Sequence, residues 1–382
     1  MPPLTYKRGF TTSLMLSALF HVSAFSQEVI HPTKDNIPTS SDPRFELRHE
    51  VNGVEGWNWN SLDVSTIGVN EGDRAQMIGF VYDLETDHNG TVYYLDLINE
   101  EIRAYDYKGD WIMNVGSPGI GPGELDKPRG LTIVPNLNRI IVNDRLMSHV
   151  FERTDSSIQL LSTKRLKHPS ITGKICAMNG HYYLVSFDIQ GSTANGLIHK
   201  YTLDGEWVTS FGEPYDYDSR FVVYSFATNT FLACNAANQT VALVTNAIPA
   251  MRGYSDQGEK LWQVTFPDYQ PRSVKEYWKN GRPTISYLSE PGEAVFSSLF
   301  SDDEFFYVTY YLSGKGSKSS SPSRPAFSDS HAFKVNAFSG LGVYLGAAGP
   351  EIGEFLLAMD GDYRFTYTEN LGFPQIRIYR PK

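Results

Sequence analysis

From about residue 61 onward, short runs of apolar or alternating apolar and polar residues are separated by clusters of turn residues. Ile102-Arg103-Ala104-Tyr105 alternates with period two, as a half-buried strand does. Asn89-Gly90 lies between two such runs and is a strong signal for a β-hairpin. No long segment shows the period of a helix. The first complete group predicts four strands, at Val81–Asp87, Thr91–Leu97, Glu101–Tyr107 and Asp110–Gly116.

This group of strands recurs along the chain. One short phrase marks each copy: an aromatic residue, three further residues, and then a glycine or aspartate at a turn. The copies end at Gly109, Asp155, Gly205 and Gly258, with a weaker one at Gly340. The first four turn positions are 46 to 53 residues apart, and this spacing fits one blade of a β-propeller.

The repeats predict an all-β protein, a six-bladed β-propeller of four-stranded antiparallel blades. The blades after the first are expected at Gly130–Lys164, Gly173–Gly212, Asn229–Phe266, Ala294–Gly346 and Phe355–Tyr379. The last of these has three strands, and its fourth strand is predicted near Leu62–Gly68. The C-terminal segment Phe373–Lys382 would then lie between that N-terminal strand and the rest of the blade. Such closure leaves no open sheet edge.

A glycine-rich phrase, Gly116-Ser117-Pro118-Gly119-Ile120-Gly121-Pro122-Gly123-Glu124-Leu125, is followed by Pro128-Arg129-Gly130-Leu131. Together with the aspartates that end the second strands of two blades, it resembles the NHL-repeat type of six-bladed propeller. The closing segment is similar to that of secreted bacterial members. The resemblance implies the fold strongly and the function weakly, because such propellers include protein-binding platforms, ligand sensors, lactonases and lyases.

The N-terminus has the pattern of a cleavable signal peptide. Lys7 and Arg8 precede an apolar stretch, Gly9–Ala24, and either Val22-Ser23-Ala24 or Ala24-Phe25-Ser26 fits the small-residue cleavage site. We expect a signal peptide at residues 1–26, an extension at 27–60 and the propeller at 61–382. Neither cleavage site is directly followed by the cysteine of a bacterial lipoprotein, and no later stretch is long and apolar enough for a membrane helix. The mature chain is therefore predicted to be secreted or periplasmic.

Charge and cysteine content narrow the function further. The formal net charge is −10, which argues against nucleic acid as a partner. The chain has two cysteines, too few for a disulfide scaffold or a four-ligand zinc site. Cys176 and Cys234 each stand four residues before a turn on the innermost strands of neighbouring blades. Equivalent residues point the same way around a ring, so we predict that the two are not bonded.

The long insertions all lie in the two classes of connection that share one face of a propeller. They are Glu213–Thr228, Pro267–Glu293, Ser313–Asp329 and Ile189–Asn195. Loops presented by a rigid scaffold often carry function, so we expect a ligand-binding or partner-binding face there. Its candidate residues are the aromatic residues and arginines of the second insertion, Tyr269, Arg272, Tyr277, Trp278, Arg282 and Tyr287. Alternatively, Tyr277 and Trp278 simply anchor their loop onto the blades.

Three aspartates, Asp96, Asp144 and Asp188, follow second strands at similar positions. They could hold calcium, or each could cap its own hairpin through an Asx-turn. No other cofactor and no catalytic residue is predicted, because the chain has neither a nucleophile elbow nor a paired-histidine motif. The leading function is an exported binding module for a protein, small molecule or glycan. The alternative is a metal-dependent hydrolase or lyase with its site in the central channel.

Overall fold

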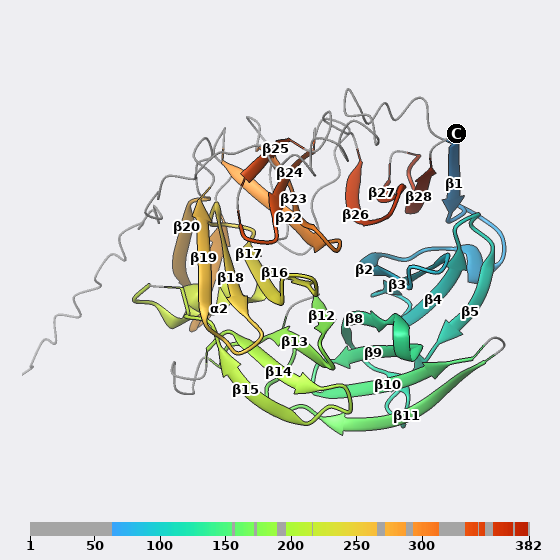
Figure 1. Ribbon diagram of the computed structural model, residues 1–382, viewed down its shortest axis with the longest axis horizontal. Coiled ribbons are helices and arrows are strands. Elements are labelled where there is room, and N and C mark those ends of the chain that lie inside the picture. The colour runs from blue at the N-terminus through green and yellow to red at the C-terminus, as the bar shows by residue number, and fades with distance from the viewer. Residues whose placement is uncertain are drawn as a thin grey trace, which may run out of the picture.

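A computed structural model shows a ring of β-sheets (Figure 1). The residues that it describes are 63–154, 157–171, 174–188, 196–215, 217–265, 272–287, 293–312, 333–342, 344–347, 354–369 and 371–380. The predicted signal peptide and N-terminal extension therefore lie outside the described residues. No helix in the described part of the chain is long and apolar enough to cross a membrane.

Six four-stranded antiparallel sheets form the blades, as predicted. Blades 1 to 3 consist of β2 (Val81–Thr86), β3 (Thr91–Asp96), β4 (Glu101–Asp106), β5 (Trp111–Val115); β8 (Pro128–Val134), β9 (Arg139–Asp144), β10 (Met147–Arg153), β11 (Ile158–Arg165); and β12 (Ile175–Met178), β13 (His181–Val185), β14 (Ile198–Thr202), β15 (Trp207–Phe211). Blades 4 to 6 consist of β16 (Thr230–Asn235), β17 (Thr240–Thr245), β18 (Ala250–Ser255), β19 (Lys260–Thr265); β22 (Ala294–Ser301), β23 (Phe305–Leu312), β24 (Lys334–Ser339), β25 (Tyr344–Ala347); and β26 (Phe355–Asp360), β27 (Tyr363–Thr368), β28 (Gln375–Arg380), β1 (Asp63–Ile67).

A few elements lie outside the blades. They are the α-helix α2 (Arg220–Thr228), the antiparallel hairpin β20 (Val274–Lys279) and β21 (Arg282–Tyr287), the short parallel pair β6 (Ser117–Pro118) and β7 (Glu124–Leu125), and the 3-10 turns η2 (Arg74–Gln76) and η3 (Pro135–Leu137). The glycine-rich phrase forms the parallel pair. The helix and the hairpin lie within the first two long insertions, and the sequence pattern predicted neither of them.

The hydrophobic core is divided into six clusters, and each fills the space between two neighbouring blades. Strand β3 shows how the sequence achieves this, because all six of its residues are buried. Val92 and Tyr94 face blade 6, whereas Tyr93 and Leu95 face blade 2. Successive residues of a strand point to opposite faces, so a strand with apolar residues at successive positions can pack on both sides.

The aromatic residue of the repeated phrase belongs to this core. Tyr105, Phe151, Tyr201 and Tyr254 are all buried on the third strand of their blades. The Tyr105 ring stacks on that of Tyr94 with a centroid separation of 5.8 Å. The phrase therefore records a packing requirement at each interface between blades.

The chain closes the ring as predicted. The last sheet has the order β1-β28-β27-β26, so the C-terminal strand lies between the N-terminal strand and β27. Asp63 pairs with Arg380 and Ile67 with Ile376. Ile67, Ile376 and Ile378 are buried in the cluster between blades 6 and 1. The two ends of the propeller domain are therefore held in one sheet.

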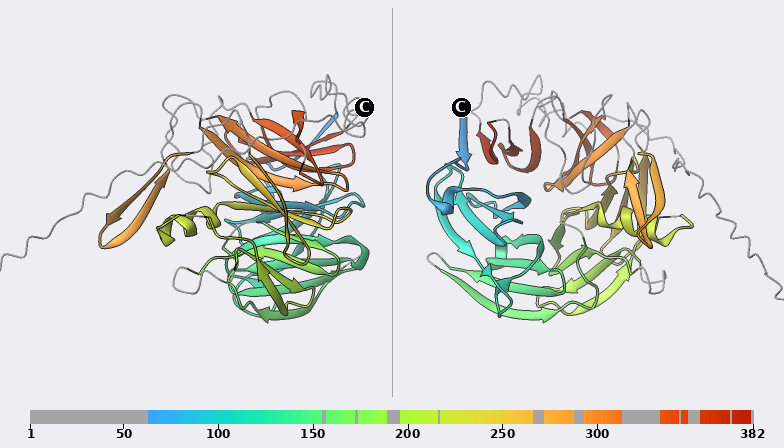
Figure 2. Two further views of the ribbon diagram at one scale, coloured as in Figure 1. Left: turned by 60° about the vertical axis from the view of Figure 1, so that its left-hand side comes forward. Right: turned by 180° about the vertical axis from the view of Figure 1, so that it is seen from behind.

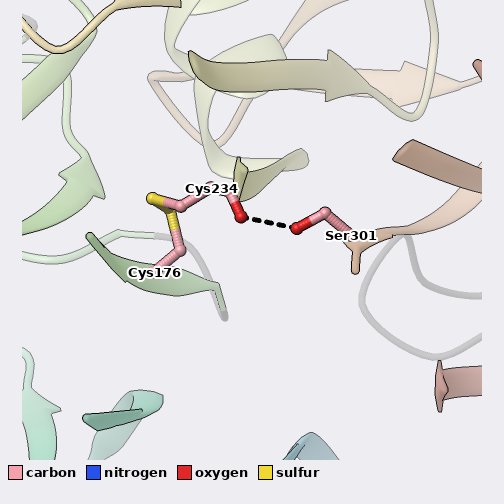
Figure 3. Close-up of a disulfide and its surroundings, with 3 residues drawn as sticks. All are labelled: Cys176, Cys234 and Ser301. Atoms are coloured by element: carbon pink, nitrogen blue, oxygen red, sulfur yellow. Dashed lines mark hydrogen bonds between the residues drawn. A yellow bond between two sulfur atoms is a disulfide. The ribbon is translucent and has the colours of Figure 1, made fainter. Parts of the chain in front are cut away.

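Cys176 and Cys234 form a disulfide with a Cα–Cα distance of 5.6 Å, so the prediction that they are unbonded was wrong (Figure 3). The two hairpins differ in loop length. Two residues follow the last pair Met178↔His181 in blade 3, and four follow Asn235↔Thr240 in blade 4. Cys176 is therefore two residues from its last pair and Cys234 is one. A one-residue offset reverses the direction of a side chain, so the two sulfur atoms face each other.

Removing the C-terminal segment 373–382 should abolish the cooperative fold. Strand β28 pairs on both sides, with five residue pairs to β1 and five to β27. Each lost backbone hydrogen bond costs about 1 kcal/mol, and the buried isoleucines are lost as well. Total stability is typically about 5–15 kcal/mol. A thermal unfolding midpoint within a few degrees of the full-length value would contradict this closure.

Breaking the disulfide should weaken the fold without destroying it. The bond links residues 58 positions apart, and a loop of that size corresponds to ~4 kcal/mol in the chain-entropy description. The Cys176→Ser/Cys234→Ser variant should therefore unfold at a lower denaturant concentration. Intact mass before and after reduction checks the bond itself: unchanged mass in protein from an oxidising compartment would show that it does not form.

Candidate functional site

Helix α2 and the β20–β21 hairpin project from the same face of the ring. Helix α2 lies in the connection from β15 to β16, and the hairpin lies in the connection from β19 to β22. Both connections run from the outermost strand of one blade to the innermost strand of the next, so they leave the ring on one side. The left view in Figure 2 shows the two elements extending together beyond the blades. The expectation that these two insertions share a face is confirmed.

Tertiary packing stabilises helix α2, which has weak local signals. Ser219 stands at the N-cap without a side-chain cap hydrogen bond. Four residues, Val222, Val223, Phe226 and Ala227, are buried in the cluster between blades 3 and 4. Thr230 and Thr245 both donate hydrogen bonds from their hydroxyl groups to the Phe226 carbonyl. The helix is therefore fixed to the scaffold along one side and at its C-terminal end.

The base of the hairpin is attached to that helix. Val274 is buried in the same cluster, and Ile285 and Tyr287 pack against it. The hydroxyl groups of Ser225 and Tyr287 are 2.9 Å apart and share a hydrogen bond. Burial raises the pKa of Tyr287 to about 12, so this phenol keeps its proton. Helix α2 and the β20–β21 hairpin, which is attached by its base, together form a cap over blades 3 and 4.

The tip of the hairpin extends into solvent. Asn280 and Gly281 have φ angles of 53° and 72°, as a two-residue hairpin turn requires. Trp278 is 54% exposed, and Lys279 and Arg282 beside it are also exposed. The tip therefore presents an indole and two cations, while the whole chain has a net charge of −10.

Arg272 lies at the foot of the hairpin and is 2% exposed. Its backbone N–H donates to the carbonyl of Ala247, at the top of blade 4. Its guanidinium carbon lies 4.7 Å from the centroid of the Tyr287 ring. The Nε and Nη2 atoms are buried and have no hydrogen-bond partner. Burial lowers the pKa of this guanidinium, against the opposing influence of Tyr311, Tyr287 and Glu293.

Two buried polar side chains accompany Arg272. Glu293 is 2% exposed, and its Oε1 accepts a hydrogen bond of 2.8 Å from the backbone N–H of Ser273. Asn246, beside Ala247, is also buried, and its Oδ1 has no hydrogen-bond partner. Asn246 and Tyr311 belong to blades 4 and 5 and carry no motif, so the sequence did not predict them as part of this site.

The structure brings together part of the predicted binding set. Arg272 and Tyr287 are in contact at the base of the hairpin, and Trp278 and Arg282 lie at its tip. Tyr277 is half-buried on β20. Tyr269 and the insertions at 189–195 and 313–329 lie outside the described residues. An Asn-Gly pair in the second insertion could have predicted the hairpin, whereas no local signal marks Arg272 as buried and unpaired.

The aspartates considered for calcium lie apart and make backbone contacts. The Asp96 carboxylate accepts hydrogen bonds from the backbone N–H groups of Gly79, Phe80, Ile98 and Asn99. The Asp144 carboxylate accepts from Asp126 and Lys127. Asp188 is exposed, and its carbonyl accepts from Arg220. Across the described residues, no three His, Cys, Asp or Glu side chains come together as a metal site.

A charged group occupies the centre of the ring. Lys174, just before β12 of blade 3, places its Nζ 2.5 Å from Asp83 Oδ1 and 3.2 Å from Glu85 Oε1, both on β2 of blade 1. Asp83 also accepts a hydrogen bond from the backbone N–H of Leu131 on blade 2. Burial raises the pKa of Asp83 to about 7, against the opposing effect of Lys174. Lys174 therefore joins three blades at their innermost strands.

Substituting Lys174 with Met should destabilise the fold by about 3–5 kcal/mol near pH 8, because it leaves a buried carboxylate without its cation. The pKa of Asp83 is higher in the folded protein than in the unfolded chain. The free energy of unfolding therefore falls as pH rises from the unfolded pKa to the folded one. The loss should therefore shrink near pH 5, where Asp83 is protonated. Denaturant unfolding at both pH values measures the loss of unfolding free energy in Lys174→Met. The control is Lys164→Met, which removes an exposed ion pair with Glu206. Equal losses in both variants would contradict the role assigned to Lys174.

Comparisons with known proteins place the fold. No protein-family model and no curated protein matches the chain. The chain is similar to the solved structure of a DUF4221 family member from Bacteroides vulgatus, with a TM-score of 0.54 and 11% identity, over 84% of this chain and 96% of that one. The chain is also similar to a Bacteroides fragilis protein whose name calls it exported. The TM-score is 0.54 and the identity 11%, over 85% of this chain and 96% of that one. For virginiamycin B lyase from Staphylococcus aureus the TM-score is 0.46 and the identity 12%, over 84% of this chain and 99% of that one. At these identities the likeness is one of fold, a β-propeller.

Proposed function

We propose that this protein is an exported β-propeller that binds a ligand or partner through the cap formed by helix α2 and the β20–β21 hairpin. The observation that carries the proposal is the exposed indole of Trp278 with two cations at the end of an element anchored to the ring. Tryptophan and arginine are enriched among the residues that dominate binding energy. A rigid ring with a projecting hairpin suits recognition, because the scaffold fixes the base and leaves the tip accessible.

Export is supported by two independent features of the chain. The N-terminal sequence combines a basic start, an apolar stretch and a small-residue cleavage site. The Cys176–Cys234 disulfide suits an oxidising compartment such as the periplasm or the extracellular space. The NHL-like glycine-rich phrase is consistent with a secreted bacterial propeller, and we propose that type for the ring.

The binding proposal can be tested with two tryptophans of similar exposure. Trp278 is 54% exposed on the cap, and Trp111 is 50% exposed at the start of β5, next to a turn on the opposite face. Ligands are sought on a glycan array and by affinity capture with the purified full chain. We expect Trp278→Ala/Arg282→Ala to bind about 10-fold or more weakly, while Trp111→Ala binds as the wild type does.

Two outcomes would count against the cap as the binding site. The first is a ligand that binds the double variant and the wild type equally well. The second is conversion of a bound ligand into product by the wild type, which would favour the enzymatic alternative. Metal analysis of protein purified without chelators then distinguishes a metal-dependent hydrolase or lyase from other chemistry.

A further inference from the structure

The guanidinium of Arg272 has one edge without hydrogen-bond acceptors. Its two unpartnered donors, Nε and Nη2, point to the same side of the planar group. This edge is the fork that binds both oxygens of a carboxylate in a bidentate pair. The guanidinium in turn needs acceptors, because burying a cation without enough hydrogen-bond acceptors is strongly unfavourable. A built environment with an unmet requirement for an anion is therefore present at the foot of the hairpin.

The neighbouring groups do not meet this requirement. Glu293 contributes an electrostatic attraction, but its Oε1 is directed to the backbone N–H of Ser273. The Tyr287 ring lies beside the guanidinium carbon at 4.7 Å and provides a π surface, while the Tyr287 hydroxyl is shared with Ser225. A cation–π contact stabilises the charge but accepts no hydrogen bond along the edge of the guanidinium.

A second buried group without a hydrogen-bond partner belongs to a residue next to one that Arg272 contacts. Asn246 Oδ1 is buried and has no donor, and the next residue, Ala247, accepts the hydrogen bond from the Arg272 backbone. The acceptor of Asn246 therefore lies one residue along the chain from the carbonyl that binds the Arg272 backbone. A ligand that satisfies both this acceptor and the Arg272 edge would carry a carboxylate and, close to it, a hydroxyl or N–H group.

We propose that Arg272 anchors the carboxylate of a hydroxy acid or sugar acid at the foot of the hairpin, with Asn246 accepting a hydrogen bond from a hydroxyl group of that ligand. This inference rests on the proposed function, because it names the ligand class for the same cap. A carboxylate fits better than a phosphate, because the edge offers two donors and Glu293 would repel a second negative charge nearby.

Glucuronate is the probe, and glucose, which has a hydroxymethyl group in place of the carboxylate, is the neutral comparison. We expect glucuronate to raise the thermal midpoint of the wild-type full chain with increasing concentration, and glucose to leave it unchanged. Saturation-transfer NMR gives a second readout of binding. Arg272→Met should weaken glucuronate binding by about 10- to 100-fold, as expected for loss of a charge-assisted bidentate pair. The glucuronate affinity of Arg272→Lys should lie between those of the wild type and Arg272→Met, because lysine keeps the charge but lacks the two-donor edge.

The unliganded midpoint separates a ligand site from a structural arginine. Arg272→Met replaces a buried cation whose Nε and Nη2 have no acceptor with an apolar chain, so the unliganded variant should melt at the same temperature as the wild type or higher. Arg252→Met is the control, since Arg252 lies on the same side of blade 4, 5.0 Å from the Tyr215 ring, and donates to the Glu213 carbonyl. This control should bind glucuronate as the wild type does.

Three results would overturn the inference. They are the absence of glucuronate binding to the wild type, equal binding by Arg272→Met, and equal or stronger stabilisation by inorganic phosphate. A lower unliganded midpoint for Arg272→Met would likewise assign the arginine to the fold. If glucuronate fails while binding that depends on Trp278 persists, the ligand class is wrong and the proposed function stands. If both fail, the cap is not a binding site.

Discussion

Every blade of this protein needs a neighbour on each side, and the whole structure depends on that constraint. Strand β3 has four successive apolar or aromatic residues, Val92 to Leu95, so an isolated sheet would leave one apolar face in water. Each of the six clusters is shared between two blades, and the ring must therefore close for the last two faces to be buried. The pairing of β1 with β28 provides this closure within a sheet. The Lys174 contact with Asp83 reinforces it where the innermost strands converge.

The sequence predicted the fold well because its repeats follow from this packing. The buried aromatic residue and the turn after it recur once per blade, so their spacing revealed the number and length of the blades. Strand ends in the first blade agree with the predicted ones to within one residue. The error at Cys176 and Cys234 has a specific cause: counting residues to a turn does not show how many of them belong to the loop. Two loop residues in one hairpin and four in the other reversed the direction of one side chain.

The candidate site was predictable as a face but not as a set of contacts. Connection class alone places the insertions on one side of the ring, and composition marked the second insertion as rich in aromatic residues and arginine. Helix α2 has no side-chain N-cap bond and spans nine residues, so it depends on blades 3 and 4 rather than on local preference. Burial of Arg272 arises from Tyr287, Glu293 and Ala247, which come from the hairpin and two blades. Such a convergence cannot be derived from spacing along one segment.

The contrast between ring and cap suggests how stability and binding are divided in this molecule. The blades pair their strands in closed sheets and are joined by shared apolar clusters and a disulfide, and these interactions supply the stability of the domain. The cap adds a two-stranded hairpin, which is marginal on its own, and a buried cation whose fork has no acceptor. Features of this kind lower stability and persist in proteins where function requires them. The ring can tolerate them because its own closure does not pass through the hairpin: removing the hairpin would leave all six blades and the β1–β28 pairing intact.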